Sequence, residues 1–154
     1  MLRLWLLAGL MCGGTFAPAV AALPSSPTGT WLTADHSAVI QVAPCGAGLC
    51  GQIVGIALAH PGDSMPVDWR GHPQCGEIIV QVAPVTNSSG TTDWEGTVLD
   101  PRDGYVYQAR LSLDANQNLH LHGYLGLPLF GQTQTWVPYR GQILMGCKLK
   151  TAAS

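Results

Sequence analysis

Apolar and polar residues alternate along most of the chain, and this period of two restricts the fold more than any other feature of the sequence. In the segment 105–114, Tyr107, Ala109 and Leu111 alternate with polar side chains. Such alternation is typical of β-strands that have one buried and one solvated face. The same pattern recurs in segments 38–43, 52–57, 77–82, 93–98, 119–125, 130–139 and, more weakly, 142–149.

Short clusters of turn-forming residues separate these segments, as hairpin connections require. The clusters lie at 35–37, 44–49, 87–90, 100–104, 114–118 and 140–141. We therefore expect an all-β fold of about eight short strands in one domain, residues 29–150. An antiparallel up-and-down barrel is the simplest closure of such a meander, because it removes exposed strand edges. A β-sandwich is the competing architecture. The long irregular segment Ala59–Gln74 is predicted to be a loop, where function often lies.

Residues 1–21 are predicted to be a secretory signal sequence. Arg3 precedes an apolar run from Leu4 to Phe16, and Ala19-Val20-Ala21 fits a cleavage site near Ala21. The Pro- and Ser-rich residues 22–28 would form a flexible lead-in. We therefore expect a periplasmic or secreted protein.

The cysteines agree with an oxidising compartment. Besides Cys12 in the signal segment, the chain contains Cys45, Cys50, Cys75 and Cys147. An even number suggests two disulfides. Cys45 and Cys50 flank the Gly-rich tip of a hairpin, which places them within disulfide reach and leaves Cys75 for Cys147. A zinc site is the alternative, although no C-x-x-C pair is present.

Composition excludes several classes of partner. The formal net charge is −2, and only 10% of the residues are charged, whereas about a quarter is usual. Such a chain is not suited to bind nucleic acid or an anionic membrane surface. No apolar stretch after Ala21 approaches the length of a membrane span. We expect a monomer.

Several sequence blocks together resemble the secreted bacterial proteins catalogued as domain of unknown function 2147. The resemblance covers about Thr28 to Trp136. It implies a lipocalin-like barrel but no established activity. The blocks are Gly29-Thr30-Trp31-Leu32-Thr33, Pro44-Cys45-Gly46, Leu49-Cys50-Gly51, Gln74-Cys75-Gly76, Trp94-Glu95-Gly96, Gly104-Tyr105-Val106-Tyr107, Gly123-Tyr124-Leu125-Gly126 and Phe130-Gly131-Gln132-Thr133-Gln134-Thr135-Trp136.

The resemblance also implies roles for single residues. Gly29-x-Trp31 looks like the opening motif of lipocalin-like barrels, in which the Trp plugs the closed end and a late Arg, here Arg140, packs over it. The chain departs from the family pattern in the loop 65–73, where relatives tend to have a short charged helix. The tail after Tyr139 extends past the usual end.

Several aromatic and amide residues stand at alternating strand positions whose side chains would share one face of the predicted sheet. They form the candidate ligand-binding lining. These side chains would face an apolar or amphipathic ligand inside the barrel. Ordinary core packing is the competing explanation for the aromatic residues, and a bulge after Pro128 would turn the two glutamines outward. Buried amides need partners, which a ligand or water would supply. The set is Trp94, Tyr105, Tyr107, Phe130, Gln132, Gln134 and Trp136.

No catalytic residue, metal or cofactor is predicted. His120 and His122 share one strand face, as a metal pair would, but Leu119 and Leu121 claim the buried face and leave the histidines outside. The sequence contains no G-x-S-x-G, H-E-x-x-H or phosphate-binding glycine motif. We therefore expect a binding protein rather than an enzyme.

Two functions remain open from the sequence. The first is a barrel that binds a small apolar or amphipathic ligand, which requires a cavity. The second is a structural or interaction module of the cell envelope, which requires a filled barrel and a partner surface on Ala59–Gln74, with Trp69 exposed.

Overall fold

The computed structural model describes residues 26–90 and 92–150. The predicted signal sequence and residues 22–25 of the lead-in lie outside these ranges. The elements are β1 (Gly29–Leu32), β2 (Ala38–Cys45), β3 (Gly48–Ile56), β4 (Ile78–Thr86), β5 (Thr92–Leu99), β6 (Val106–Leu113), β7 (Leu119–Tyr124), the 3-10 helix η1 (Pro128–Phe130), β8 (Gln132–Pro138), β9 (Ile143–Leu144) and β10 (Lys148–Leu149).

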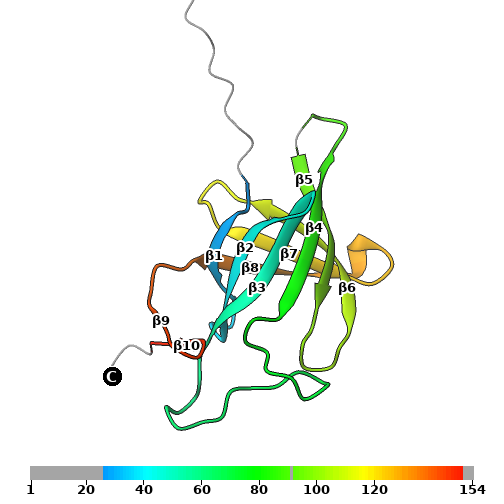
Figure 1. The fold of residues 1–154 in the computed structure, drawn as a ribbon. Coiled ribbons are helices and arrows are strands. Elements are labelled where there is room, and N and C mark those ends of the chain that lie inside the picture. The colour runs from blue at the N-terminus through cyan, green and yellow to red at the C-terminus, as the bar shows by residue number, and fades with distance from the viewer. Residues whose placement is uncertain (1–25, 91, 151–154) are drawn as a thin grey trace, which may run out of the picture.

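Eight of the described strands, β1–β8, form a closed antiparallel barrel (Figure 1). Each strand pairs with the next in the chain, and β8 returns to pair with β1. Closure leaves neither β1 nor β8 as a free edge, which excludes the sandwich. The prediction of an all-β up-and-down barrel is confirmed.

The core lies inside the barrel and consists of the inward residues of alternate positions. Trp31 belongs to it, and its indole N–H donates a hydrogen bond of 3.0 Å to the carbonyl of Pro27, just before β1. Arg140, expected to pack over this ring, is exposed after the end of β8. The buried core residues are Trp31, Ile40, Val42, Leu49, Ile53, Ile56, Val80, Val82, Ala109, Leu111, Leu119, Leu121 and Trp136.

The C-terminal hairpin β9–β10 lies against β3 beyond the point where β4 diverges (Figure 1). Strand β10 pairs in parallel with β3, and the Ile56 N–H donates to the Cys147 carbonyl at 2.7 Å. Gly55 allows this close approach, because a Cβ there would overlap the end of the Leu149 side chain, which would have to move. Val39, opposite Gly55, is fully buried although it is not part of the interior core. The hairpin therefore covers an outer patch of the barrel wall.

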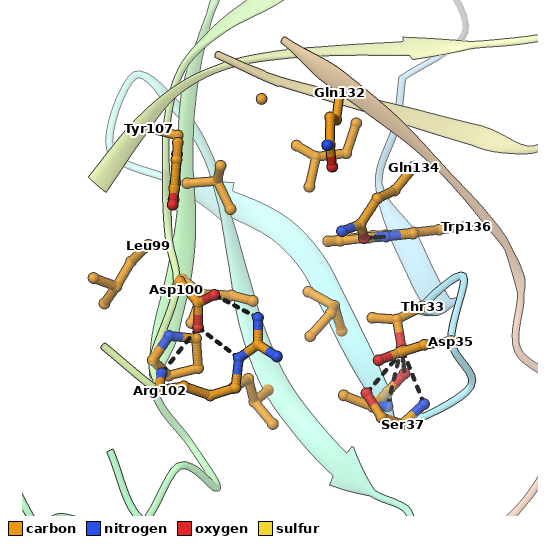
Figure 2. Close-up of a pocket in the computed structure, with 18 of the residues that line it drawn as sticks. Thr33, Asp35, Ser37, Leu99, Asp100, Arg102, Tyr107, Gln132, Gln134 and Trp136 are labelled. Atoms are coloured by element: carbon orange, nitrogen blue, oxygen red, sulfur yellow. Dashed lines mark hydrogen bonds and ion pairs between the residues drawn. The ribbon is translucent and has the colours of Figure 1, made fainter. Parts of the chain in front are cut away.

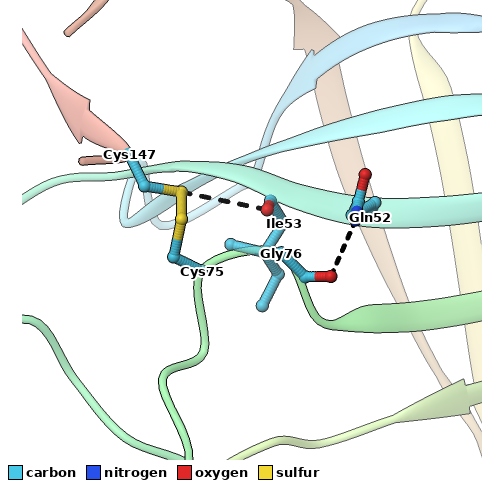
Figure 3. The surroundings of a disulfide bond; sticks show 5 residues. All are labelled: Gln52, Ile53, Cys75, Gly76 and Cys147. Atoms are coloured by element: carbon cyan, nitrogen blue, oxygen red, sulfur yellow. Dashed lines mark hydrogen bonds between the residues drawn. A yellow bond between two sulfur atoms is a disulfide. The ribbon is translucent and has the colours of Figure 1, made fainter. Parts of the chain in front are cut away.

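Both predicted disulfides are present. Cys45 and Cys50 close the β2–β3 hairpin with Cα atoms 5.6 Å apart, and Cys75 and Cys147 are joined with Cα atoms 6.0 Å apart. Figure 3 shows the second bond beside β3, where the Gly76 N–H donates to the Ile53 carbonyl at 2.8 Å. The Cys75–Cys147 disulfide connects the end of the β3–β4 loop to the C-terminal hairpin.

Asp114 organises the β6–β7 turn. Its Oδ1 accepts the backbone N–H groups of Asn116 and Asn118 at 2.8 and 2.9 Å, and the His120 ring nitrogen lies 3.1 Å from Oδ2. The backbone hydrogen bond from Asn118, followed by the bond with His120, lowers the pKa of Asp114 from 3.8 to about 2. The turn is therefore built around an ionised carboxylate.

The described residues contain no helix long and apolar enough to cross a membrane.

Replacing Leu111 with alanine should reveal the contribution of the filled core. Leu111 is fully buried, so Leu111→Ala should lower the free energy of unfolding by about 2–5 kcal/mol through lost burial and cavity formation. Leu129 is 86% exposed, so the matched Leu129→Ala should change it by less than about 0.5 kcal/mol. Urea denaturation measures both. Equal effects would show that Leu111 is not in a packed core.

The two disulfides should contribute unequally to stability. The Cys75–Cys147 bond closes a loop of 72 residues and the Cys45–Cys50 bond a loop of 5 residues. Loop-closure entropy alone predicts that their removal lowers the free energy of unfolding by about 4 and about 2 kcal/mol, respectively. Denaturation of Cys75→Ala/Cys147→Ala and Cys45→Ala/Cys50→Ala variants tests this order. A larger loss for the short loop would contradict it.

The Asp114→Asn variant should show a pH-dependent difference from the wild type. The folded pKa of about 2 lies below the ordinary value of 3.8. The stability contributed by ionised Asp114 is therefore present above about pH 4 and lost as the pH falls toward 2. The wild type should be more stable than Asp114→Asn at pH 7, and the gap should close across that window. A gap that is independent of pH would contradict this role.

Candidate functional site

One end of the barrel interior is hollow. The cavity has a volume of about 580 Å³ and opens among the β1–β2, β5–β6 and β7–β8 loops. In an antiparallel up-and-down barrel these loops all leave the same end. Volumes of about 300–1,000 Å³ are typical of sites for small molecules.

The deep walls of the cavity are apolar. Ile40, Ile53, Leu121 and Trp136 line it and also belong to the buried core. Other core residues, such as Leu111, do not reach it and fill the space beneath. The interior is thus divided into a packed part and an open part.

Strand β8 supplies a polar wall (Figure 2). Gln132 and Gln134 point inward beside Trp136, and Tyr107 of β6 stands on the opposite side. The indole N–H of Trp136 donates to Oε1 of Gln134 at 2.9 Å. Alternating residues of one strand share a face, which places both glutamines on the same side as Trp136.

Two short hydrogen-bonded loops place carboxylates at the mouth (Figure 2). Asp35 accepts hydrogen bonds from the Thr33 hydroxyl at 2.8 Å and from the backbone N–H and hydroxyl of Ser37 at 3.1 and 2.8 Å. Burial raises the pKa of Asp35, but these hydrogen bonds outweigh burial, so the pKa lies below its ordinary value. The carboxylate is therefore ionised at neutral pH.

Asp100 and Arg102 form an ion pair on the other side of the mouth. Nε and Nη2 of Arg102 donate to the two carboxylate oxygens at 3.0 and 2.6 Å, and the Arg102 backbone N–H donates to Oδ1 at 2.9 Å. The side-chain hydrogen bond is the main cause that lowers the pKa of Asp100 and raises that of Arg102. Both groups remain charged and bound to each other.

The β3–β4 loop (57–77) is anchored to the β5–β6 loop by Trp69. The Trp69 backbone N–H donates to the Pro101 carbonyl at 3.0 Å. The guanidinium of Arg70 lies 4.2 Å from the centre of the Trp69 ring. Gly104 has a φ of +80°, and a Cβ there would overlap the Trp69 ring. Trp69 remains 44% exposed, so the predicted exposure is only partial.

A charge cluster stabilises the same loop. Buried Asp68 accepts hydrogen bonds from Arg70 Nε and from the backbone N–H groups of Arg70 and His72 at 2.8–2.9 Å. Burial raises the pKa of Glu77, and the neighbouring Asp68 carboxylate raises it further. Arg70 bridges both carboxylates, at 2.8 Å from Asp68 and 3.1 Å from Glu77.

The β7–β8 loop gives the mouth an apolar edge. Leu125 and Phe130 line the cavity entrance, and Leu127 and Leu129 project from the same loop. All four side chains are exposed.

The structure brings five of the seven predicted lining residues together. Tyr107, Phe130, Gln132, Gln134 and Trp136 all line the cavity, although Phe130 is largely exposed at its edge.

Trp94 and Tyr105 do not reach the cavity. Trp94 faces inward as expected, but it packs against the core. Tyr105 precedes β6 and is 62% exposed, with its ring 6.4 Å from that of Tyr107.

From the sequence, the charged mouth residues are expected only as parts of the turns 35–37 and 100–104. Asp35, Asp100 and Arg102 belong to alternate turns of the meander, and alternate turns meet at the same end of a barrel. That topological signal was sufficient to place them together.

The histidines are engaged in local contacts. His122 lies 2.8 Å from the Thr133 hydroxyl and 2.7 Å from the Pro128 carbonyl, whereas His120 contacts Asp114. No group of three or more metal-ligating side chains with suitable spacing occurs among the described residues.

Comparison with known proteins places the chain in a family. No curated protein matches its sequence. Among solved structures, protein HP1028 from Helicobacter pylori, described as belonging to the lipocalin family, is similar with a TM-score of 0.60 and 16% identity over 75% of this chain and 84% of that chain. This likeness shows a shared fold. The family model of uncharacterised bacterial proteins known as DUF2147 matches residues 29–137. The chain belongs to the DUF2147 family and has a lipocalin-like barrel.

Proposed function

We propose that this protein binds a small amphipathic molecule in the open half of its barrel and acts as a carrier or sensor rather than as an enzyme. The observation that carries the proposal is the cavity of about 580 Å³, whose walls combine apolar core residues with inward amides. Sites of this kind surround most of a small ligand and orient it through a few polar groups. The lipocalin-like fold agrees with this proposal.

The charged groups at the mouth support binding more than catalysis. Asp35 is held by donors of its own loop, and Asp100 is paired with Arg102. The pKa values of these carboxyls are lowered, away from the neutral range that suits a general acid or base.

Two further parts of the proposal concern the setting of the protein. Two disulfides are typical of proteins outside the cytoplasm, and together with the predicted signal sequence they support a periplasmic or secreted location. Among the strands that the structure describes, the closed barrel leaves no long free edge for self-association, which supports a monomer.

The alternative, an envelope module with a filled barrel and a partner surface at Ala59–Gln74, is less well supported. The interior is partly hollow. Trp69, its expected contact residue, is engaged with Gly104, Arg70 and the Pro101 carbonyl.

Partly filling the cavity should weaken binding without disturbing the fold. Gly123 lines the cavity, and a Cβ there would meet only ordinary contacts at 3.6–3.9 Å with Val98, Gln108 and Tyr107. Gly123→Leu should weaken binding of the neutral probe N-phenyl-1-naphthylamine at least about tenfold, because the added side chain occupies the ligand volume. Fluorescence titration measures this affinity.

Thr135→Leu is the matched control. Thr135 is exposed on β8, one position from inward Trp136, so it faces outward and should leave probe binding unchanged. Wild-type affinity in a folded Gly123→Leu variant would refute binding in this cavity. Thermal unfolding of both variants confirms that they are folded.

A further inference from the structure

The orientation of the Gln134 amide is fixed by its neighbour. Trp136 is 2% exposed, and its indole nitrogen can only donate a hydrogen bond. The Gln134 atom 2.9 Å from it must therefore be the amide oxygen. Reversing the amide would leave a buried donor facing a second donor, which is costly.

The consequence is a fixed donor inside the cavity. With Oε1 turned to Trp136, the amide nitrogen of Gln134 points into the open space (Figure 2). The described hydrogen bonds give this nitrogen no protein partner. A ligand group placed there has to be a hydrogen-bond acceptor, such as a carbonyl oxygen.

The charges around the cavity restrict that acceptor further. Among the described residues that line it, Asp35 and Asp100 are anionic and Arg102 is the one cation. Arg102 is already bound by Asp100 through two side-chain hydrogen bonds. A carboxylate ligand would therefore enter a mouth of net negative charge without a free cation to pair with, which burial of an anion requires.

We propose that the ligand is a neutral amphiphile whose carbonyl group, as an ester or amide, accepts a hydrogen bond from Gln134, and that the site discriminates against free carboxylic acids. This inference rests on the proposed binding function and specifies its ligand class. The apolar portion would lie against Ile40, Ile53 and Leu121.

Competition at pH 7 against bound N-phenyl-1-naphthylamine tests the proposal with methyl decanoate and decanoate. These compounds share an acyl chain and differ in charge. Methyl decanoate should displace the probe at a concentration at least about tenfold lower than decanoate, because like charges at the mouth oppose the anion. Equal or better displacement by decanoate would overturn the proposed ligand class and leave the binding function intact.

Comparing Gln134→Glu with Gln132→Glu distinguishes the loss of the Gln134 donor from the effect of an added negative charge. Both variants add one carboxylate to the same wall, but only Gln134→Glu replaces the fixed donor by an acceptor while one oxygen still bonds Trp136. Methyl decanoate should lose about three- to tenfold more affinity in Gln134→Glu than in Gln132→Glu. Equal losses of affinity would show that Gln134 does not donate a hydrogen bond to the ligand.

Asp100→Asn provides a gain of binding. The asparagine oxygen can still accept the Arg102 backbone N–H. The substitution removes the negative charge that binds the Arg102 guanidinium, so the guanidinium becomes available to an anionic ligand. Decanoate affinity should rise several-fold relative to methyl decanoate. An unchanged ratio would contradict the electrostatic part of the proposal, whereas failure of the neutral probe to bind the wild type at all would refute the binding function itself.

Discussion

The pairing of β1 with β8 is the contact on which the rest of the structure depends. It involves the residue pairs Trp31–Pro138 and Leu32–Val137, together with a hydrogen bond of 2.8 Å from the Tyr139 N–H to the Thr30 carbonyl. Without it the sheet would have two free edges and no enclosed interior. With it, the inward side chains of all eight strands share one space, and alternate loops meet around one opening. The hydrophobic core and the cavity are therefore two parts of the same interior.

Side-chain size at the inward positions decides where that interior is filled. An eight-stranded barrel is just wide enough for side chains to fill it or for one small ligand to enter. Large apolar residues such as Leu111 and Leu119 close the packed half, whereas Gly123 and the amides Gln132 and Gln134 occupy inward positions of the open half. Glycine leaves volume unfilled, and amides are costly to bury without partners. The residues that weaken the core are thus the ones that create the cavity.

The alternation of the sequence was sufficient to predict the strands, their inward faces and the barrel, because side-chain direction in a strand depends only on parity. Alternation shows whether a side chain points inward or outward, but it does not show how far along the barrel axis the side chain lies. Trp94 therefore faces inward as predicted but lies in the packed half, and Tyr105 lies in the β5–β6 loop just before β6 begins. The bond between Gln134 and Trp136 joins positions two apart on one strand and could have been anticipated. The place of Asp100 at the mouth could likewise have been anticipated, because alternate turns of the predicted barrel meet at the same end.

The most direct test of this account is the measurement of intermolecular nuclear Overhauser effects between methyl decanoate and the methyl groups of the protein. The account predicts contacts from the acyl chain to Ile40, Ile53 and Leu121, which line the cavity. Contacts restricted to the exposed Leu127 and Leu129 of the β7–β8 loop would place the ligand on the surface and contradict a ligand-binding interior.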